Sequence, residues 1–393
     1  MTTLQAGQSV LVTGGSGFIG RHLVGALRAT GARVRVLTRA PEAVERLFAE
    51  GDGHDGVEVC EGDLLSAENV AKACADVETV FHVGGLYKFG PRHAREMWRV
   101  NVEGTEHVLA AAWRARVGRV VHVSSTGVLS GGSRKPLTER DFPSHRPRWS
   151  PYRASKWEAE RRALDWAARG LPVVIACPPC PVGPGDEGPT PTGRMVLDFI
   201  AGRFPFSART GLNFIGVSDL IGGLLAVARQ GRPGERYLLG QENLWLDEFL
   251  ALLSELTGRP PPRVQLPWPV IALAGVFGEA AGRLGWHRPG EDRAAECRIC
   301  LETALKARCV QFFDCDKARW ELGWQPRRPL RDSVAEAVAW FQARLPAAAA
   351  QSRPARAAAA TSPHHHHPQG GCVSAAAAAE LAAEAGAEVH GAS

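Results

Sequence analysis

A tyrosine and a lysine four residues apart are the side chains of this sequence best suited to proton transfer. Tyr152 and Lys156 would lie on one face of a helix, about one turn apart. A free phenol has a pKa of about 10, which is too high for efficient proton exchange near neutral pH, and a nearby ammonium group favours the phenolate. We therefore expect Tyr152 to act as a general acid or base and Lys156 to tune it.

Hydroxyl groups follow an apolar segment upstream of this pair. Residues 119–125 predict a buried strand, with Ser124 and Ser125 at its carboxyl end, where ligands bind in open α/β sheets. Ser125 can donate a hydrogen bond to a substrate oxygen. We expect a hydroxyl at this strand end to complete the catalytic group.

Glycines at three-residue spacing separate the first expected strand from the first expected helix. Gly14 permits a tight turn, Gly17 lets the backbone approach a pyrophosphate, and Gly20 lets the helix pack against its strand. The N-terminus of that helix offers free N–H groups to phosphates. This order of strand, glycine turn and helix predicts a dinucleotide-binding site.

The end of the second expected strand, residues 34–39, decides between two cofactors. NAD-preferring sites usually carry an acidic residue there for the ribose hydroxyls, whereas an arginine can hold a 2′-phosphate. This strand ends in Thr38 and Arg39, and the first acid is Glu42. The pattern favours NADP(H), with NAD(H) as the alternative; Arg39 could otherwise be a solvated surface charge.

Together these motifs resemble the extended short-chain dehydrogenase/reductase family, also described as the NAD-dependent epimerase/dehydratase family. The resemblance extends from Ser9 to about Phe341 and is closest to dihydroflavonol-4-reductase-like proteins and to those called hopanoid-associated sugar epimerases. It is carried by residues 13–20, 101–105, 152–156, 190–194, 234–240 and 313–318.

The resemblance implies an α/β fold: a doubly wound parallel sheet of the Rossmann kind with a smaller C-terminal α/β part. Residues 1–180 would form the NADP-binding domain. Residues 181–345 would form the substrate-binding part, in which residues 212–219 return once to the main sheet. The Ala-, Pro- and His-rich composition of residues 346–393 predicts disorder.

The resemblance also assigns roles. Ser125 would be the catalytic serine, with Ser124 as its neighbour and Thr126 as a lesser candidate. Lys156 would hold the nicotinamide ribose. Asp63 would face the adenine, and Asn101 would lie beside the cofactor; the alternative for each is a helix N-cap. The full set of expected cofactor contacts is Gly14, Gly17, Phe18, Ile19, Gly20, Arg39, Asp63, Leu64, Val83, Gly84, Gly85, Asn101, Tyr152, Lys156, Pro178 and Cys180.

Three functions remain open. The favoured one is an NAD(P)-dependent oxidoreductase that transfers a hydride between NADP(H) and a carbonyl or secondary alcohol, as in dihydroflavonol reduction or oxidation of a 3β-hydroxysteroid or hopanoid-type lipid. The alternatives are a sugar epimerase that retains NAD(P) and a non-catalytic NAD(P)-sensing module. Thr126 and Gly127 replace the Asp-Glu pair of nucleotide-sugar dehydratases, which disfavours that activity.

A leucine points to the class of substrate. Enzymes acting on nucleotide-sugars usually place an arginine a few residues before the element Val217-Ser-Asp219, where it clamps the diphosphate. Leu212 stands there instead, which favours an uncharged or apolar substrate. The apolar residues 267–277 could line a lipid-sized pocket or touch a bilayer surface, although a core-facing helix is the favoured interpretation.

Composition and charge bound the remaining partners. A formal net charge of +5 over 393 residues, without a basic cluster interleaved with aromatics, gives no reason to expect nucleic acid. Nine cysteines and the absence of an evident signal peptide predict a reduced, cytoplasmic protein, with peripheral membrane contact left open. The pairs Cys177/Cys180 and Cys297/Cys300 are not expected to bind metal, because Pro178 and Pro179 remove turn amides. A homodimer through two helices, one carrying Tyr152, is also open.

Overall fold

The computed structural model describes residues 6–49, 57–88, 90–129, 135–147, 150–204, 206–283 and 309–345. All of these described residues belong to one compact unit. The predictions for residues 346–393 and for Cys297 and Cys300 lie outside the described residues.

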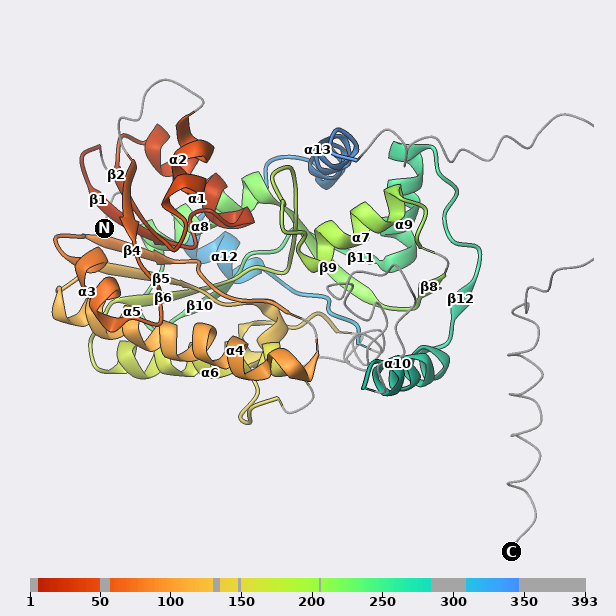
Figure 1. Cartoon of the computed structure of the whole chain (residues 1–393), viewed down its shortest axis with the longest axis horizontal. Helices are drawn as coiled ribbons and strands as arrows, with labels where there is room; N and C mark the ends of the chain where they lie inside the picture. The colour runs from red at the N-terminus through yellow and green to blue at the C-terminus, as the bar shows by residue number, and fades with distance from the viewer. Residues whose placement is uncertain are drawn as a thin grey trace, which may run out of the picture. The chain divides into compact units, whose positions relative to one another are not determined.

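A seven-stranded sheet organises this unit (Figure 1). Its order is β3-β2-β1-β4-β5-β6-β10, and every pairing is parallel. The strand order reverses between β1 and β4, the point at which such sheets bind ligands. The strands are β1 (Ser9–Thr13), β2 (Arg33–Thr38), β3 (Val57–Glu61), β4 (Thr79–His82), β5 (Arg119–Val123), β6 (Val173–Cys177) and β10 (Arg236–Leu238).

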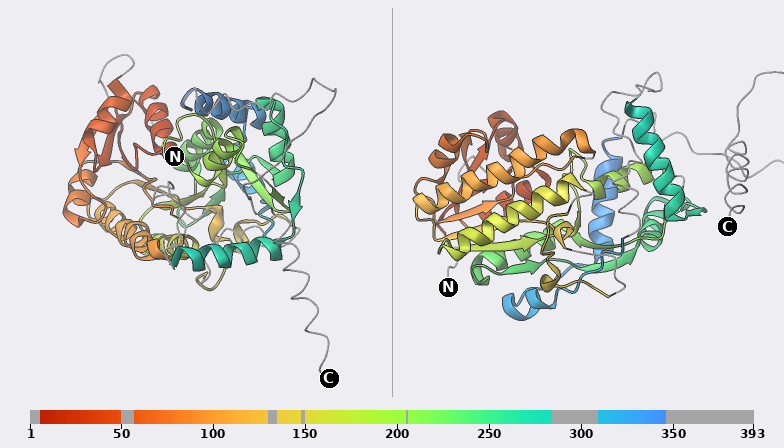
Figure 2. Two further views of the ribbon diagram at one scale, coloured as in Figure 1. Left: turned by 45° about the vertical axis from the view of Figure 1, so that its right-hand side comes forward. Right: turned by 90° about the horizontal axis from the view of Figure 1, so that it is seen from below.

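Helices cover both faces of this sheet because its central strands are apolar on both sides; β4 and β6 are buried along their whole length. One face packs against α1 (Phe18–Ala29), α2 (Pro41–Ala49), α8 (Val217–Gln230) and α12 (Asp316–Leu322). The other packs against α3 (Ala67–Cys74), α5 (Gly104–Arg114) and α6 (Pro151–Ala168). In Figure 2, α5 and α6 lie side by side. The predicted doubly wound parallel sheet is confirmed.

One helical run crosses the edge where the strands end. It begins with α4 (Ala94–Trp98), passes through a π-helical segment (Arg99–Glu103) and continues as α5. Single π-helical turns inside α-helices often occur at functional sites. Here the π-helical segment contains Asn101.

A smaller apolar cluster forms around a second sheet, of order β11-β9-β7. Its strands are β7 (Cys180–Val182), β9 (Gly211–Gly216) and β11 (Glu242–Trp245), and it packs against α7 (Pro191–Ile200), α9 (Leu246–Thr257) and α13 (Leu330–Gln342). A two-stranded sheet joins β8 (Ser207–Ala208) to β12 (Gln265–Leu266).

The prediction that residues 212–219 return to the main sheet is wrong. Among the strands described here, β9 pairs with β7 and β11, because Phe214 stacks on Phe249 of α9 in the smaller cluster. Residues 217–219 already belong to α8. The return to the main sheet is made by β10, which pairs with β6.

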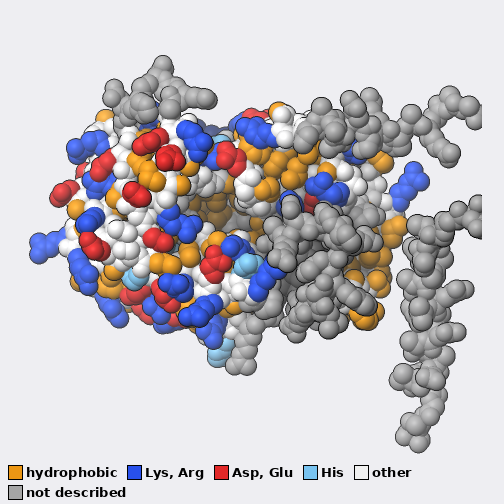
Figure 3. Space-filling view, in the orientation of Figure 1, with side chains coloured by type: hydrophobic (Ala, Val, Ile, Leu, Met, Phe, Trp, Pro, Cys, Tyr) orange, Lys and Arg blue, Asp and Glu red, His pale blue; other side chains and the backbone are white. Residues whose placement is uncertain are grey.

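The apolar segment near residue 270 forms α10 (Trp268–Arg283). The favoured interpretation as a core-facing helix is wrong for most of its described side chains: Ile271 is buried, but five large apolar side chains are exposed, namely Trp268, Val270, Leu273, Val276 and Phe277. Within the described residues, no helix combines the length and apolarity needed to cross a membrane. On the face shown in Figure 3, basic and acidic side chains alternate over the part that carries the large sheet.

Candidate active site

The carboxyl end of β5 and the first turns of α6 bring Ser125, Tyr152 and Lys156 together. The Ser125 hydroxyl hydrogen-bonds to the phenol of Tyr152. It also accepts a hydrogen bond from Gly127 N at 3.0 Å. Lys156 Nζ donates to the carbonyl oxygen of Val123 at 2.8 Å, and so reaches the same strand end. The three predicted residues therefore form one connected group.

The start of α6 is fixed by its own sequence. The Ser150 side chain accepts a hydrogen bond from Arg153 N at 3.3 Å as the N-cap, and Pro151 occupies the first turn, where its missing N–H costs nothing. Trp157 and Ala163 pack into the core beneath the sheet. Because these contacts fix the rotation of the helix, Tyr152 and the ammonium of Lys156 lie against β5.

Burial dominates the electrostatics of this pair. It raises the pKa of Tyr152 to about 12, and the hydrogen bond from Ser125 opposes the rise. Burial lowers the pKa of Lys156 to about 8, and Glu160 opposes that fall. The expectation that Lys156 is the group favouring the phenolate differs from this structure, because Ser125 has that effect while Val123 holds the ammonium.

The glycine turn has the predicted geometry. Gly14 has a φ of +71°, and a Cβ there would lie 2.7 Å from Gly84 Cα. A Cβ on Gly20 would lie 2.0 Å from Gly14 O, so α1 packs directly against the turn. Gly17 is the N-cap of α1 and provides no capping side chain. The first N–H groups of α1 are thus left for an anion, as a pyrophosphate requires.

Two flanking residues of the turn take different roles. Phe18 is buried, stands edge-on to His22 at 5.8 Å between ring centroids, and approaches Gly183 beyond β7. Ile19 packs its side chain into the core on the other side. Only the backbone of Ile19 is therefore directed to the turn.

Gly85 lies in a polar cradle. A Cβ built on it would lie 3.3 Å from Asn101 Oδ1 and 3.5 Å from Lys156 Nζ. Asn101 Oδ1 accepts from Leu86 N at 2.7 Å, and its Nδ2 donates to Ser155 Oγ at 2.9 Å. The N-cap alternative for Asn101 is wrong, since the residue lies within a continuous helical run and its amide joins the segment after β4 to α6.

Asp63 and Leu64 follow β3 at the same edge. The Asp63 carboxylate accepts a hydrogen bond from Leu65 N at 3.0 Å within its own turn. Its N-cap alternative is also wrong, because Ser66 caps α3 by accepting from Asn69 N. Leu64 packs beside Gly84, since its Cδ1 would lie 3.0 Å from a Cβ there. Val83 packs against the core.

Arg39 is exposed directly after β2. Among the described residues, no side chain or carbonyl pairs with its guanidinium. An unpaired arginine at this strand end fits the predicted contact with a 2′-phosphate.

Residues 178–180, which follow β6, also lie beside this site. Thr126 N donates to Pro178 O at 3.1 Å, which ties this segment to the residue next to Ser125. Cys180 lies near enough to Tyr152 for its thiol to raise the pKa of the phenol further. Both residues therefore lie beside the group of Ser125 and Tyr152, and their predicted contact with the cofactor stays a prediction.

Two features of the site were not predicted. Tyr87, two residues after Gly85, packs edge-on to Tyr152 with ring centroids 4.2 Å apart. An aromatic residue just after the glycine pair was the available signal. The second feature is Glu160, which extends the four-residue spacing of Tyr152 and Lys156 by one further step.

A buried hydrogen-bonded chain joins the two glycine turns and was also missed. Gly84 N donates to Thr13 Oγ1 at 3.1 Å, and Thr13 Oγ1 lies 2.8 Å from His82 Nδ1. His82 Nε2 lies 2.9 Å from Thr105 Oγ1, which donates to Asn101 O at 2.6 Å. Because the Thr105 hydroxyl donates to Asn101, Nε2 of His82 must donate to Thr105 and Nδ1 must accept from Thr13.

These residues fit a dinucleotide: a tight glycine turn, uncapped helix N–H groups, the cradle at Gly85 and an unpaired arginine all lie at one sheet edge. In the described part of the chain, no group of three or more His, Cys, Asp or Glu residues could hold a metal ion.

Relatives of known name share most of this chain. A protein of Synechocystis provisionally named dihydroflavonol 4-reductase is 33% identical, over 84% of this chain and 94% of its own. Sterol demethylase protein B of Methylococcus capsulatus is 32% identical, over 86% of this chain and 99% of its own. The crystal structure of gox2253 has a TM-score of 0.72 and 33% identity, covering 86% of this chain and 98% of its own.

The model of one family, described as the NAD dependent epimerase/dehydratase family, matches residues 10–240. That stretch runs from β1 to just beyond β10, and so contains the glycine turn, Ser125, Tyr152 and Lys156. The resemblance to the extended short-chain dehydrogenases is confirmed, and a nicotinamide dinucleotide is the cofactor of this group. The chain belongs to the NAD dependent epimerase/dehydratase family.

Proposed function

We propose that this protein is an NADP(H)-dependent oxidoreductase that interconverts a carbonyl group and a secondary alcohol on a small, uncharged or apolar substrate. The observation that carries the proposal is the connected group of Ser125, Tyr152 and Lys156 at the carboxyl end of β5. The relatives named as reductases support the reaction class.

The chain's own groups account for the proton. NADPH, when bound, supplies the hydride. Ser125 donates a hydrogen bond to the substrate oxygen and holds it beside the phenol. Tyr152, which stays protonated because burial raises its pKa to about 12, gives its proton to that oxygen. The hydrogen bond from Ser125 stabilises the negative charge that develops on the phenolic oxygen. Lys156, held by Val123 O beside Gly85, would hold the nicotinamide ribose.

The preference for NADP(H) rests on Arg39. Its guanidinium has no partner among the described residues and follows β2, where the adenosine ribose lies in sheets of this order. No acidic residue stands at that strand end to hold ribose hydroxyls.

The substrate class rests on Leu212. This residue faces Leu244 of the neighbouring strand β11 and packs against the smaller apolar cluster. The nearest arginine, Arg209, lies over the ring of Trp245 at 5.7 Å. An apolar side chain at this place cannot clamp a diphosphate. The Methylococcus relative is named for sterol chemistry, which agrees with an apolar substrate.

The second candidate is an epimerase that retains its cofactor, which the name of the family keeps open. Net consumption of cofactor separates the two. We expect the stripped protein to bind NADPH more tightly than NADH in calorimetry, and to oxidise NADPH when given a dihydroflavonol or a 3-ketosteroid. Retained NAD that does not exchange, together with epimerisation of a nucleotide-sugar, would contradict the proposal.

Peripheral membrane contact and a homodimer stay predictions. The exposed apolar side chains of α10 favour the first. Sedimentation with phosphatidylcholine vesicles tests it, and the mass measured by light scattering tests the second.

A further inference from the structure

A buried carboxylate that the proposed reaction does not use lies one helical turn beyond Lys156. Glu160 is 0% exposed. Its Oε2 accepts from Ser124 Oγ at 2.5 Å, and its Oε1 accepts from Arg236 Nε at 2.7 Å. A buried charge needs partners of this kind to offset the loss of water.

The carboxylate joins three elements around the catalytic group. Glu160 lies on α6, Ser124 follows β5, and Arg236 begins β10. Ser124 is the residue before Ser125, and Val123, the residue before that, holds Lys156 Nζ. Glu160 and Lys156 therefore both hold the strand end that carries Ser125: Glu160 hydrogen-bonds to Ser124, and Lys156 hydrogen-bonds to Val123.

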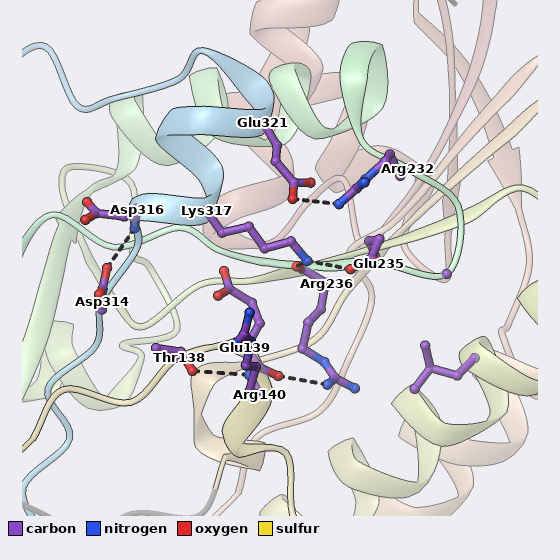
Figure 4. A pocket seen from close by; sticks show the side chains of 12 residues that line it. Thr138, Glu139, Arg140, Arg232, Glu235, Arg236, Asp314, Asp316, Lys317 and Glu321 are labelled. Carbon is purple, nitrogen blue, oxygen red and sulfur yellow. Dashed lines mark hydrogen bonds and ion pairs between the residues drawn. The ribbon is translucent and has the colours of Figure 1, made fainter.

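The charge of Arg236 favours the ionised form of the Glu160 carboxylate. Besides its bond to Glu160, Arg236 donates to Glu139 O at 3.1 Å and lies over the Phe142 ring at 4.1 Å. Its side chain also borders a cavity of about 620 Å³ at the β10 edge, most of whose lining residues are charged (Figure 4). Burial raises the pKa of Glu160, and the charge of Arg236 is the largest influence that opposes it.

Burial favours the neutral forms of the other titratable groups around Lys156 and Glu160. His122 on β5 and His82 on β4 have pKa values lowered by burial. Cys177 on β6 lies 4.0 Å from Glu160, and burial raises the pKa of its thiol. Glu139, from the turn before α6, also has its pKa raised by burial.

Tyr152 on α6 is likewise kept in its neutral form, by a pKa raised to about 12 through burial. Glu160, one helical turn from Lys156 and paired with Arg236, is the largest charge influence on the Lys156 ammonium, ahead of Cys177.

We propose that Glu160 is a positioning residue: held by Ser124 and Arg236, it anchors the strand end that carries Ser125 and places a buried negative charge one helical turn from the Lys156 ammonium. The catalytic importance of this effect rests on the proposed function, but the effect itself does not.

The direct test is the titration of Lys156 in the cofactor-free protein, followed by the ¹³Cε resonances of labelled lysine. The chain has only six lysines, and Lys156→Arg identifies the signal by its loss. We expect a midpoint near 8 in the parent protein. In Glu160→Gln the midpoint should fall by about one pH unit, as expected when an opposite charge is removed at this range.

Two variants serve as controls. Glu160→Asp keeps the charge and should restore most of the shift. Glu158→Gln alters a carboxylate on the same helix that pairs with Arg161 and Arg162, and should leave the midpoint unchanged. If Glu160→Gln fails to fold, Ser124→Ala tests the same link. It removes a hydrogen bond that favours the ionised form of Glu160 without changing the charge nearby, so the midpoint should also fall. An unchanged midpoint in a folded variant of either position overturns the proposal.

The pH dependence of kcat/KM for NADPH oxidation then gives the catalytic consequence: its alkaline limb should move to lower pH in Glu160→Gln. A shifted lysine titration with no activity in the parent protein would contradict the proposed function and leave the role of Glu160 standing. Full activity in the parent protein, together with an unshifted lysine titration in Glu160→Gln, would overturn the role of Glu160 and leave the proposed function standing.

Discussion

Gly14 and Gly84 meet backbone to backbone where the strand order of the large sheet reverses: a Cβ on Gly14 would lie 2.7 Å from Gly84 Cα and 2.8 Å from Gly84 N. The turn after β1 and the end of β4 are thereby held at a separation that only two glycines allow. Thr13, the residue before Gly14, accepts a hydrogen bond from Gly84 N, and this bond stabilises the contact between the two glycines.

Gly14→Ala should therefore disturb the turn twice, through the clash and through the positive φ of +71°. We expect a loss of about 1–3 kcal/mol in the free energy of unfolding and at least a tenfold weaker binding of NADPH. Urea unfolding and calorimetry measure the two effects.

Gly25→Ala is the matched control on the neighbouring helix α1. A Cβ there meets nothing within 4 Å, and Gly25 is exposed. Alanine should stabilise the protein by about 0.5–1 kcal/mol because it suits a helix interior better than glycine. Equal effects of the two substitutions would contradict the account of the turn.

Arg39→Ala should weaken NADPH binding by about 10–100-fold, the usual worth of a hydrogen bond to a charged group, and should change NADH binding little. Calorimetric titration with both cofactors measures the ratio. Arg33→Ala, at the other end of β2, should alter neither affinity. Parallel losses for NADPH and NADH in Arg39→Ala would show that the residue does not read the 2′-phosphate.

Two buried histidines make the free energy of unfolding depend on pH. Burial lowers the pKa of His82 to about 3 and that of His122 well below 6.5, whereas both titrate near 6.5 in the unfolded chain. Between these values the unfolded state binds more protons, so stability falls as the pH drops below about 6.5, by about 1.4 kcal/mol per pH unit for each histidine.

His122→Leu should remove one of these two contributions. Neither ring nitrogen of His122 has a hydrogen-bond partner within the described part of the chain, so leucine should also stabilise the protein at pH 7 by about 1–2 kcal/mol. Urea unfolding at pH 7, 6 and 5 measures both effects. His145→Leu, at an exposed position, should leave the pH dependence intact. An unaltered slope in His122→Leu would contradict the assignment.

The features that the sequence predicts depend on residues that are close together in the chain. The glycine turn, the parallel strands and the shared face of Tyr152 and Lys156 follow from spacing within a few residues. The partners of Glu160 do not, because Arg236 is 76 positions away and reaches it only through the pairing of β10 with β6. β9 was assigned to the wrong sheet for the same reason: its neighbours β7 and β11 are set by packing of Phe214 on α9. The sequence predicts that Asn101 begins a helix, but its side-chain amide hydrogen-bonds to Leu86, after β4, and to Ser155 of α6.

The central claim is that the phenol of Tyr152 transfers the proton. The most direct measurement compares Tyr152→Phe with Tyr237→Phe in kcat for NADPH oxidation and in the Kd for NADPH. Tyr237 is a distant tyrosine whose hydroxyl bonds to Glu321, so its removal should spare turnover. We expect Tyr152→Phe to lower kcat by at least about a hundredfold while the Kd for NADPH stays within a few-fold of the parent value. A Tyr152→Phe protein that keeps most of its turnover would contradict the account.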